Sequence, residues 1–285
     1  MSLLSAWIQT QEVTPLGDVD GYRAAVRTGL KRVLGAVPGR EASGCTVLIY
    51  HRVGGGSPDE RDLAVADFEA QLDELASHDV LRLDDALDRI ERGDTSPSVV
   101  LTFDDGFRDV YEHAWPRLRE ARLPSTLYLA TAFVGGTMHW DGSTAKAAGP
   151  ALEWAHIEEM ASTGLVTVGA HTHNHARPEL LTTEELDFCD SAIEERLGTR
   201  PRHFAYPWGV AVPRMEEELR RRYRSSVTGE LGRNQPGVDL ARLRRVPVRR
   251  TDPIGFFRAK LRGSLGPEKA YAGMVALAKR SGARA

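Results

Sequence analysis

Seven short runs of apolar, largely β-branched residues recur along the chain and constrain its fold more than any other feature. Most are apolar at nearly every position, which is typical of strands covered on both faces in a parallel sheet. The stretches between them have apolar residues three and four positions apart, as in Val65, Phe68, Leu72 and Leu75, and this spacing predicts helices with one buried face. The predicted strands are Thr46–Tyr50, Ser98–Phe103, Ser125–Ala130, Leu165–Ala170, His203–Tyr206, Ser225–Thr228 and Leu243–Val248.

Two of the predicted helices carry clear signals at their ends. Residues 154–163 have an inward-facing apolar pattern, and Gly164 follows as a C-terminal stop. Residues 182–197 begin with the pattern of a capping box, in which Thr182 bonds forward to the backbone and Glu185 reaches back. The strand–helix alternation predicts an α/β fold with a parallel sheet or a barrel, and spacing alone does not separate the two.

The alternation predicts one domain over residues 45–262, with an N-terminal extension over 1–44 and a C-terminal tail over 263–285. Residues 20–40 place apolar side chains on one helical face and basic side chains around the rest. Such a helix can lie on an anionic membrane or pack on the domain with its charges in water, and the sequence leaves both open. The apolar positions are Val26, Leu30, Val33 and Leu34, the basic ones are Arg23, Arg27, Lys31 and Arg32, and Phe256, Phe257, Lys260, Leu261 and Arg262 repeat the pattern near the other end.

Composition excludes several classes of protein. The 37 Lys and Arg residues against 40 Asp and Glu give a net charge of −3 and no global reason to expect nucleic-acid binding. No apolar run approaches the ~18 residues of a membrane span, and the N-terminus lacks the charged region of a signal peptide, so we expect a cytoplasmic protein. Cys45 and Cys189 are isolated, which favours reduced thiols. With nine histidines and two cysteines, a metal site would be built from histidine and carboxylate side chains.

Three polar motifs follow predicted strands, at the end where ligands bind in α/β sheets and barrels. The first is Thr-Phe-Asp-Asp-Gly over residues 102–106. A strand end that turns through Gly106 lets Asp104 and Asp105 face one pocket, where one carboxylate could bind a metal while the other stays free as a base. The alternative is a pair of turn and cap residues that start the following helix.

The second motif places three imidazoles within five residues, at His171, His173 and His175. Packing hardly explains three of them, so the motif predicts a metal site, and on a turn or helix start His171 and His175 converge. The third motif is Phe-Ala-Tyr-Pro-Trp-Gly over residues 204–209. It combines a rigid turn with aromatic faces of the kind on which sugars stack, or else with aromatics that cap a core.

The chemistry of these residue types favours a catalytic metal. Two histidines and one aspartate leave an open position on a tetrahedral Zn²⁺, the arrangement of catalytic rather than structural sites. Such a metal polarises a carbonyl and lowers the pKa of its water to about 7. A neighbouring carboxylate can then remove the proton of that water, while an acid protonates the leaving amine. These parts fit the hydrolysis of an amide or an ester.

In this order, T-F-D-D-G, H-T-x-x-H and F-A-Y-P-W-G resemble the motifs of the polysaccharide deacetylase family, the NodB-homology or carbohydrate esterase family 4 domain, over about residues 45–262. The resemblance implies a distorted (β/α) barrel of about seven parallel strands. It also implies a divalent metal, usually zinc, with Co²⁺, Ni²⁺ and Mn²⁺ as alternatives. By the same resemblance, Asp104 is the general base, Asp105, His171 and His175 are the metal ligands, the backbone N–H of Trp208 is an oxyanion donor, and Thr172 is the hydroxyl that supports the histidines.

Two positions depart from the family pattern. Ala205 stands where many members have an arginine that pairs with the catalytic aspartate, and our candidate replacement is Arg245. No histidine follows His203 to supply the catalytic imidazole of a late strand. Residues 48–53, Leu-Ile-Tyr-His-Arg-Val, resemble instead the first strand of circularly permuted members such as the poly-N-acetylglucosamine deacetylases. That resemblance implies that His51 is the general acid, and the alternative is a strand-end histidine bonded to backbone.

We therefore expect a metal-dependent N-deacetylase that acts on an N-acetylated amino sugar. The alternatives are a deformylase or another hydrolase of non-peptide C–N bonds on the same fold, and a non-catalytic module that binds metal or glycan. The expected substrate is a free, nucleotide-linked or lipid-linked sugar or a glycosylated natural product, and the basic ends favour a lipid-linked one with peripheral contact at the inner face of the membrane. The predicted substrate contacts are Tyr206, Pro207, Trp208 and Trp140, although Trp140 could instead be a hydrophobic anchor for its loop.

Overall fold

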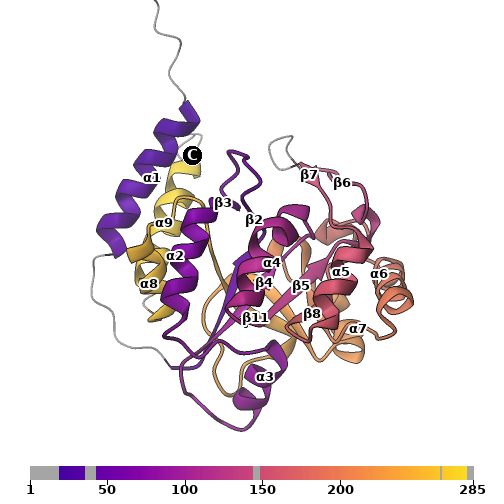
Figure 1. The fold of residues 1–285 in the computed structure, drawn as a ribbon. Helices are drawn as coiled ribbons and strands as arrows, with labels where there is room; N and C mark the ends of the chain where they lie inside the picture. The colour runs from indigo at the N-terminus through magenta and orange to yellow at the C-terminus, as the bar shows by residue number, and fades with distance from the viewer. Residues whose placement is uncertain (1–18, 36–42, 144–147, 264, 281–285) are drawn as a thin grey trace, which may run out of the picture.

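The computed structural model describes residues 19–35, 43–143, 148–263 and 265–280. Within these residues, seven parallel strands close into a barrel in the order β1-β11-β10-β9-β8-β5-β4 (Figure 1). The predicted α/β barrel is confirmed, and every predicted strand is present. The barrel strands are β1 (Cys45–Tyr50), β4 (Ser98–Phe103), β5 (Ser125–Leu129), β8 (Val166–Ala170), β9 (His203–Ala205), β10 (Ser225–Leu231) and β11 (Leu243–Pro247).

The first strand of the chain closes the barrel against the last. Strand β1 lies between β4 and β11, and all six of its residues pair with β4, from Cys45 with Ser98 to Tyr50 with Phe103. Closure is weakest between β8 and β9, which share a single registered residue pair. The barrel is therefore distorted on that side, as the family resemblance implies.

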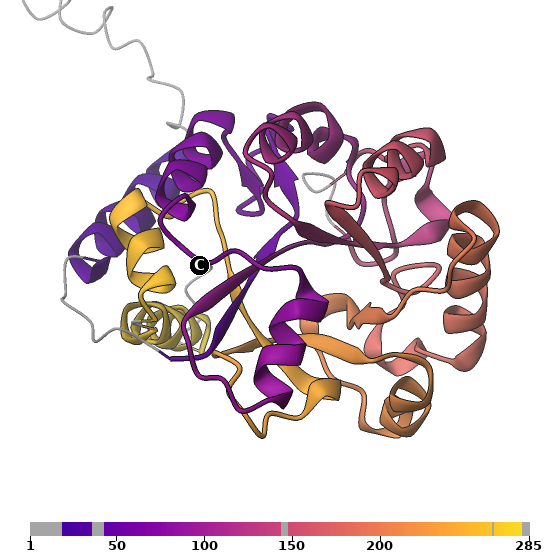
Figure 2. The same cartoon turned by 60° about the horizontal axis from the view of Figure 1, so that its bottom comes forward.

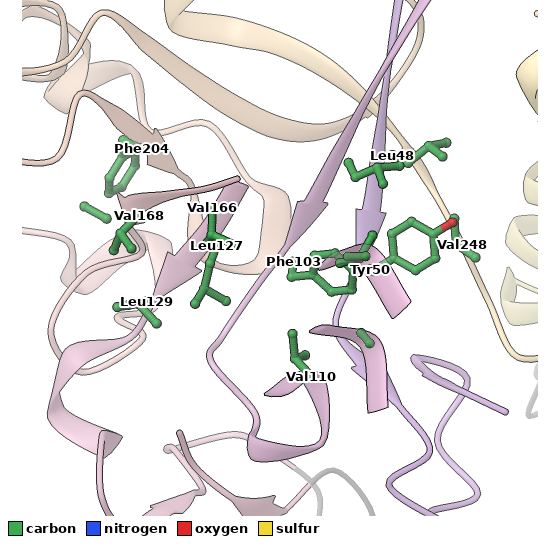
Figure 3. Close-up of a cluster of buried hydrophobic side chains, with 14 of the residues drawn as sticks. Leu48, Tyr50, Phe103, Val110, Leu127, Leu129, Val166, Val168, Phe204 and Val248 are labelled. Carbon is green, nitrogen blue, oxygen red and sulfur yellow. The ribbon is translucent and has the colours of Figure 1, made fainter. Parts of the chain in front are cut away.

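The main hydrophobic core lies between the barrel and the helices around it. Tyr50 and Phe103 come from adjacent strands and stack with 5.2 Å between ring centroids, as Figure 3 shows. Phe68 of the following helix meets both rings edge-on. Buried aromatic pairs of this kind add about 0.5–1.5 kcal/mol beyond the burial of their surface. This packing fixes the ends of the two strands that carry His51 and Asp104.

Helices surround the barrel, as Figure 2 shows from the end of the molecule where residues 83–91 lie. The helix over residues 83–91 is absent from the predictions, although its buried residues recur at helical spacing. A π-helical turn, Val110–Ala114, precedes α4. The helices are α1 (Val19–Gly35), α2 (Val65–Leu75), α3 (Leu83–Glu91), α4 (Trp115–Glu120), α5 (Trp154–Ser162), α6 (Thr183–Leu197), α7 (Glu216–Arg222), α8 (Ile254–Leu261) and α9 (Gly266–Arg280).

Two small sheets stand at the end of the barrel opposite α3 (Figure 1). One is a parallel pair that directly follows β1, and the other is an antiparallel pair between β5 and α5. Their strands are β2 (Arg52–Val53), β3 (Asp62–Leu63), β6 (Thr137–Met138) and β7 (Gly149–Pro150). Because the barrel strands finish at this end, these small sheets border the region where a ligand site is expected.

One predicted helix end is confirmed and the other is wrong. Helix α5 ends at Ser162, and Gly164 has a φ of 73°, which suits a glycine that stops a helix. The capping box at the start of α6 is not formed, because the side chain of Thr182 caps no backbone N–H. The carboxylate of Glu185 instead binds Asn174 in the histidine motif. The Glu185 carboxylate that a capping box needs is therefore hydrogen-bonded to a residue outside the helix.

Helix α1 packs against α8 and α9, so both ends of the described chain lie together (Figure 1). The predicted faces of this helix are partly wrong. Lys31, expected among the solvated charges, is completely buried and donates from Nζ to Asp252 Oδ1 at 2.7 Å, whereas Val26 and Val33 are 53% and 71% exposed. A buried carboxylate needs a cationic partner, and this requirement outweighs the apolar pattern of the helix. Residues 1–18 and 36–42 of the predicted extension lie outside the described residues.

The predicted second basic segment also packs on the domain. Phe256, Phe257 and Leu261 are buried, and Lys260 donates to the other carboxylate oxygen of Asp252 at 2.6 Å. Of the two possibilities for a basic amphipathic helix, α8 therefore shows packing on the domain. Contact with a membrane surface stays a prediction. Among the described residues, no helix is long and apolar enough to cross a membrane.

Candidate functional site

The Asp-Asp-Gly turn follows β4 and is tied to the strands on either side. The N–H of Asp104 donates to the Tyr50 carbonyl at 3.0 Å, and the N–H of Ala130 donates to the Asp105 carbonyl at 3.0 Å. Both carboxylates are buried. The interpretation in which the two carboxylates face one pocket is therefore favoured over exposed turn and cap residues.

Asp105, His171 and His175 form a group whose potential ligand atoms all lie within 4.8 Å of one another. Asp105 Oδ1 lies 3.4 Å from Nε2 of each histidine. The other carboxylate oxygen, Oδ2, is buried and has no hydrogen-bond partner in the described parts of the chain. An orphaned buried oxygen beside two converging imidazoles fits a bound metal ion. The structure thus brings together all three predicted ligands.

Separate contacts orient the histidine rings of the motif. Nδ1 of His171 donates to the Ala205 carbonyl at 2.8 Å, so Nδ1 carries a proton and Nε2, which faces Asp105, is the nitrogen that could bind a metal. His173 turns instead to the Thr131 hydroxyl, 2.9 Å from its Nδ1. The motif therefore supplies two imidazoles to the metal-binding group and a third that braces the neighbouring loop.

Arg245 of β11 forms a bidentate ion pair with Asp104, with both Nη–Oδ distances at 2.8 Å. Its Nε donates to the Thr228 carbonyl at 2.9 Å, and Nη1 also donates to the Thr102 hydroxyl at 3.2 Å. Burial alone would raise the pKa of the Asp104 carboxyl, but the Arg245 guanidinium, together with the His171 and His51 imidazoles, outweighs burial and holds that pKa below its ordinary value. The contact proposed in place of the motif arginine is present, and Asp104 is held as a carboxylate.

His51 follows the last residue of β1 and is half-buried, and its Nδ1 has no hydrogen-bond partner among the described residues. Burial lowers the pKa of His51 to about 4, against the opposing effect of the Asp105 and Asp104 carboxylates. The imidazole is therefore neutral at pH 7 while it lies in the field of both carboxylates. The alternative of a ring held by backbone finds no support at Nδ1, and the acid role stays a prediction.

Backbone strain is concentrated at this site. Among the described residues, five non-glycine residues have a positive φ, and four of them are Asp105, Thr172, His175 and Trp208. Such conformations cost on the order of 1–3 kcal/mol each and persist only where the surrounding structure enforces them. Gly209, next to Trp208, also has a positive φ, of 69°. A side chain there is excluded as well, because a Cβ would lie 2.8 Å from the backbone of Gly229.

The prediction that Tyr206 contacts substrate is wrong. Its ring is fully buried and packs edge-on against Phe204 with 5.2 Å between centroids, so it has no face open to a ligand. Pro207 is buried as well. Trp208 is 45% exposed and lies 5.4 Å from the His175 ring, centroid to centroid. In this motif Trp208 alone offers an open aromatic face beside the metal-binding group.

The prediction that Trp140 lines a substrate groove is also wrong, and the loop-anchor alternative is correct. Trp140 is 4% exposed and packs with Phe107 and Phe133. Its ring lies over His175 at 4.0 Å between centroids. The tryptophan therefore anchors its loop and covers one side of a metal-ligand candidate.

Two polar contacts shape the turn that carries the histidines. The Thr172 hydroxyl accepts a hydrogen bond from the Ala176 N–H at 3.0 Å and so closes the turn between His171 and His175. Sequence reasoning overlooked the second contact, in which Glu185 accepts from the Asn174 backbone N–H at 2.8 Å and its side-chain amide at 2.7 Å. These contacts fix the spacing of the two imidazoles.

Sequence reasoning also overlooked two charged pairs beside the site. Arg52 Nε donates to Asp109 Oδ2 at 2.7 Å in a buried ion pair. Arg61 binds both carboxylate oxygens of Asp59, at 2.9 and 3.0 Å, and its charge acts on His51. The Arg52–Asp109 pair could have been suspected from the positions of its members in the sequence. Arg52 directly follows the strand-end histidine, and Asp109 lies one helical turn beyond the Asp-Asp-Gly motif.

Comparison with known proteins agrees with this geometry. Residues 91–223 match the family model described as polysaccharide deacetylase. Over these residues the chain is similar to the polysaccharide deacetylase family. The structure of IcaB from Ammonifex degensii is 27% identical, with a TM-score of 0.66 over 79% of this chain and 100% of that chain.

Two curated relatives carry the same name, poly-β-1,6-N-acetyl-D-glucosamine N-deacetylase. The protein of Staphylococcus epidermidis is 27% identical over 199 residues, which are 60% of this chain and 66% of the relative. The protein of Staphylococcus aureus is 26% identical over 158 residues, 50% of this chain and 52% of the relative. The alignments thus span between half and two thirds of the curated relatives. His51 and Arg245 lie outside the residues that match the family model.

Proposed function

We propose that this protein is a metal-dependent hydrolase that removes the N-acetyl group from an amino sugar. The observation that carries the proposal is the placement of Asp104, held as a carboxylate by Arg245, directly beside the Asp105–His171–His175 group. A module that only binds metal or glycan needs no such base. The names of the curated relatives support acetyl as the group that is removed.

Asp105, His171 and His175 would hold a divalent metal ion. Two imidazoles and a carboxylate suit Zn²⁺, and Co²⁺, Ni²⁺ or Mn²⁺ are alternatives that the same ligands accept. When bound, such an ion polarises a carbonyl oxygen and lowers the pKa of a water molecule to about 7. The hydrogen bond from His171 to the Ala205 carbonyl keeps that ring in the tautomer that a metal requires.

Asp104 and His51 would each carry out one of the two proton transfers of the reaction. Both oxygens of Asp104 accept from Arg245, and each keeps a second lone pair that can take a proton from the attacking water. The backbone N–H of Trp208 is the proposed donor to the oxyanion. His51 is neutral at rest, so the proton that it would pass to the departing nitrogen is the one that Asp104 takes from the attacking water. The Asp104 and Asp105 carboxylates favour the imidazolium that carries this proton.

The proposed substrate carries N-acetylglucosamine residues. The exposed face of Trp208 lies beside His175, where a sugar ring can stack on it while the acetamide reaches the metal-binding group. The β-1,6-linked oligosaccharide is the first candidate because the curated relatives carry that linkage in their name. A free, nucleotide-linked or lipid-linked N-acetyl sugar is the second.

The test is acetate release from a panel of substrates with one, three and five N-acetylglucosamine units in β-1,6 linkage, with β-1,4 oligosaccharides, N-formyl sugars and cyclic imides beside them. Acetate from the N-acetyl sugars supports the proposal. Formate or ring-opened product without acetate would favour another hydrolase of non-peptide C–N bonds, and bound metal without turnover on any amide would favour a binding module.

Metal removal gives a direct prediction for the three ligands. Stripping the protein with a chelator is expected to abolish turnover, and one equivalent of Zn²⁺ per chain should restore it, because the described part of the chain provides one group of three converging ligands. His175→Ala should lose the metal as measured by elemental analysis. His173→Ala is the matched control, since this imidazole binds Thr131 and should leave metal content unchanged. Equal loss in both variants would contradict the ligand assignment.

Loss of the His51 imidazole is expected to slow turnover without loss of metal. His51→Ala should lower kcat by about 10²-fold, the usual contribution of a positioned acid or base, while metal content stays at the wild-type value. His78→Ala is the control, because this ring bonds to the Glu74 carbonyl at the end of α2. A wild-type rate in His51→Ala would return His51 to a purely structural role.

A further inference from the structure

Among the described residues, Nδ1 of the His51 ring has no hydrogen-bond partner, so the backbone on either side of the ring has a large part in placing it. On one side the Tyr50 carbonyl accepts from the N–H of Asp104 at 3.0 Å. On the other side the chain enters β2, where Arg52 and Val53 pair with β3. Whatever holds β2 against the Asp-Asp-Gly segment therefore sets the distance between the imidazole and the two carboxylates.

Asp109 makes that connection. It lies at the start of the π-helical turn, four residues after Asp105, and uses both of its carboxylate oxygens on β2. Oδ2 accepts from Arg52 Nε at 2.7 Å, and Oδ1 accepts from the Val53 N–H at 3.2 Å. One side chain thus fixes the residues directly after His51 to the segment that carries the base and the first metal ligand.

Arg52 extends the connection to a third segment. Its guanidinium lies over the Phe107 ring at 4.6 Å, and Nη1 donates to the Ala148 carbonyl at 3.3 Å, beside the first residue of β7. The hairpin that β7 closes with β6 includes Trp140, which covers His175. Arg52 therefore contacts the segments on both sides of the metal-binding group.

Two glycines enclose the ion pair and leave no room for larger residues. A Cβ on Gly55 would lie 2.3 Å from Arg52 Nη2 and 2.6 Å from Asp109 Oδ2. A Cβ on Gly149 would lie 2.8 Å from Arg52 Nη2. Both charged side chains are less than a tenth exposed. The pair therefore fills the space between these two glycines, and Asp109 also holds the Val53 N–H, two residues after His51.

We propose that the Arg52–Asp109 pair is a positioning device that sets His51 against Asp104 and Asp105, an inference that rests on the proposed acid role of His51. Buried ion pairs are weak sources of stability, because desolvation offsets their attraction. What the pair supplies is a fixed geometry between β2, the Asp-Asp-Gly segment and the β6–β7 hairpin. A misplacement of about 1 Å in a catalytic group can cost about 10²-fold in rate.

The competing explanation is that the pair only stabilises the fold, and a double-mutant cycle separates the two. Asp109→Asn keeps the size of the side chain but removes the ion pair, and Arg52→Lys keeps the charge but cannot reproduce the Nε and Nη1 contacts. Each is made alone and combined with His51→Ala. Glu74→Gln is the control, since it breaks the bidentate contact of Glu74 with Arg258 between α2 and α8.

Positioning predicts non-additive effects on turnover. Asp109→Asn should lower kcat by about 10²-fold, with KM within about twofold and one metal ion still bound. Arg52→Lys should lower kcat as well. In the His51→Ala background the same changes should cost less than about twofold, because the group that they position is already gone. Equal losses in both backgrounds, or a wild-type kcat in Asp109→Asn, would overturn the inference.

A second readout does not depend on activity. In the metal-free protein, the ring NMR signals of His51, assigned by their absence in His51→Ala, should shift or broaden in Asp109→Asn. The ring of His203, bonded to the Ser225 hydroxyl at 2.9 Å, should be unaffected. If the wild-type chain releases no acetate, the proposed function fails and this spectrum decides the positioning inference, which an unchanged His51 signal would overturn.

Discussion

Asp104→Asn is expected to lose about 10³-fold in turnover while still binding one metal ion per chain. The carboxamide has the size of the carboxylate and can still accept one hydrogen bond from Arg245, so the fold should tolerate it. It cannot take a proton from water at neutral pH. The three metal-ligand candidates are untouched, because Asp104 is not a member of their group.

Steady-state acetate release and elemental analysis measure the two halves of this prediction. Asp190→Asn is the matched control, since Asp190 is a buried carboxylate that accepts from the Tyr223 hydroxyl at 2.6 Å and takes no part in the site. Its turnover should stay near the wild-type value. Normal turnover in Asp104→Asn would remove Asp104 from the base role, and loss of the metal would place it among the ligands.

Arg245→Met is expected to lower the free energy of unfolding by about 3–5 kcal/mol, the usual effect of removing one member of a buried ion pair. The substitution leaves Asp104 buried without its bidentate partner, and it also frees the Thr228 carbonyl and the Thr102 hydroxyl that Arg245 binds. Turnover should fall as well, because the base loses the cation that keeps it ionised and oriented.

Urea unfolding measures the stability change, and two further variants test its cause. The double variant Arg245→Met with Asp104→Asn should recover part of the lost stability, since it removes the unpaired charge. Arg220→Met breaks a bidentate pair of the same chemistry with Asp239 on the surface, and should cost less than about 1 kcal/mol. A small effect of Arg245→Met with no recovery in the double variant would contradict the buried-charge explanation.

Local features of the sequence predicted the barrel and the core of the site. Most barrel strands are short apolar runs whose pattern is set within a few residues, so reading along the chain finds them. Asp105 lies in a turn directly after one such run, and His171 and His175 lie four residues apart after another. Because parallel strands end on the same side of a barrel, these side chains had to meet.

The aromatic contacts illustrate what local pattern does not determine. Tyr206, Trp140 and Trp208 are alike in sequence terms, each beside a turn. Tyr206 is buried against Phe204, Trp140 is buried over His175, and Trp208 stays open. Which side of the chain faces solvent depends on elements that pack from elsewhere, so exposure of a large ring is not readable from its neighbours in sequence.

The sequence by itself determined the strands, the Asp-Asp-Gly turn and the histidine spacing, since these depend on interactions between residues close together in the chain. Sequence reasoning named Arg245 only as a candidate partner for Asp104, and the tertiary structure decided that pair, the Arg52–Asp109 pair and the burial of Lys31 on Asp252. Each of these is a contact between residues 57 to 221 positions apart. The sequence offers many acidic and basic side chains as alternatives, and burial chooses among them, because a charge taken out of water must meet the opposite charge that the fold brings to it.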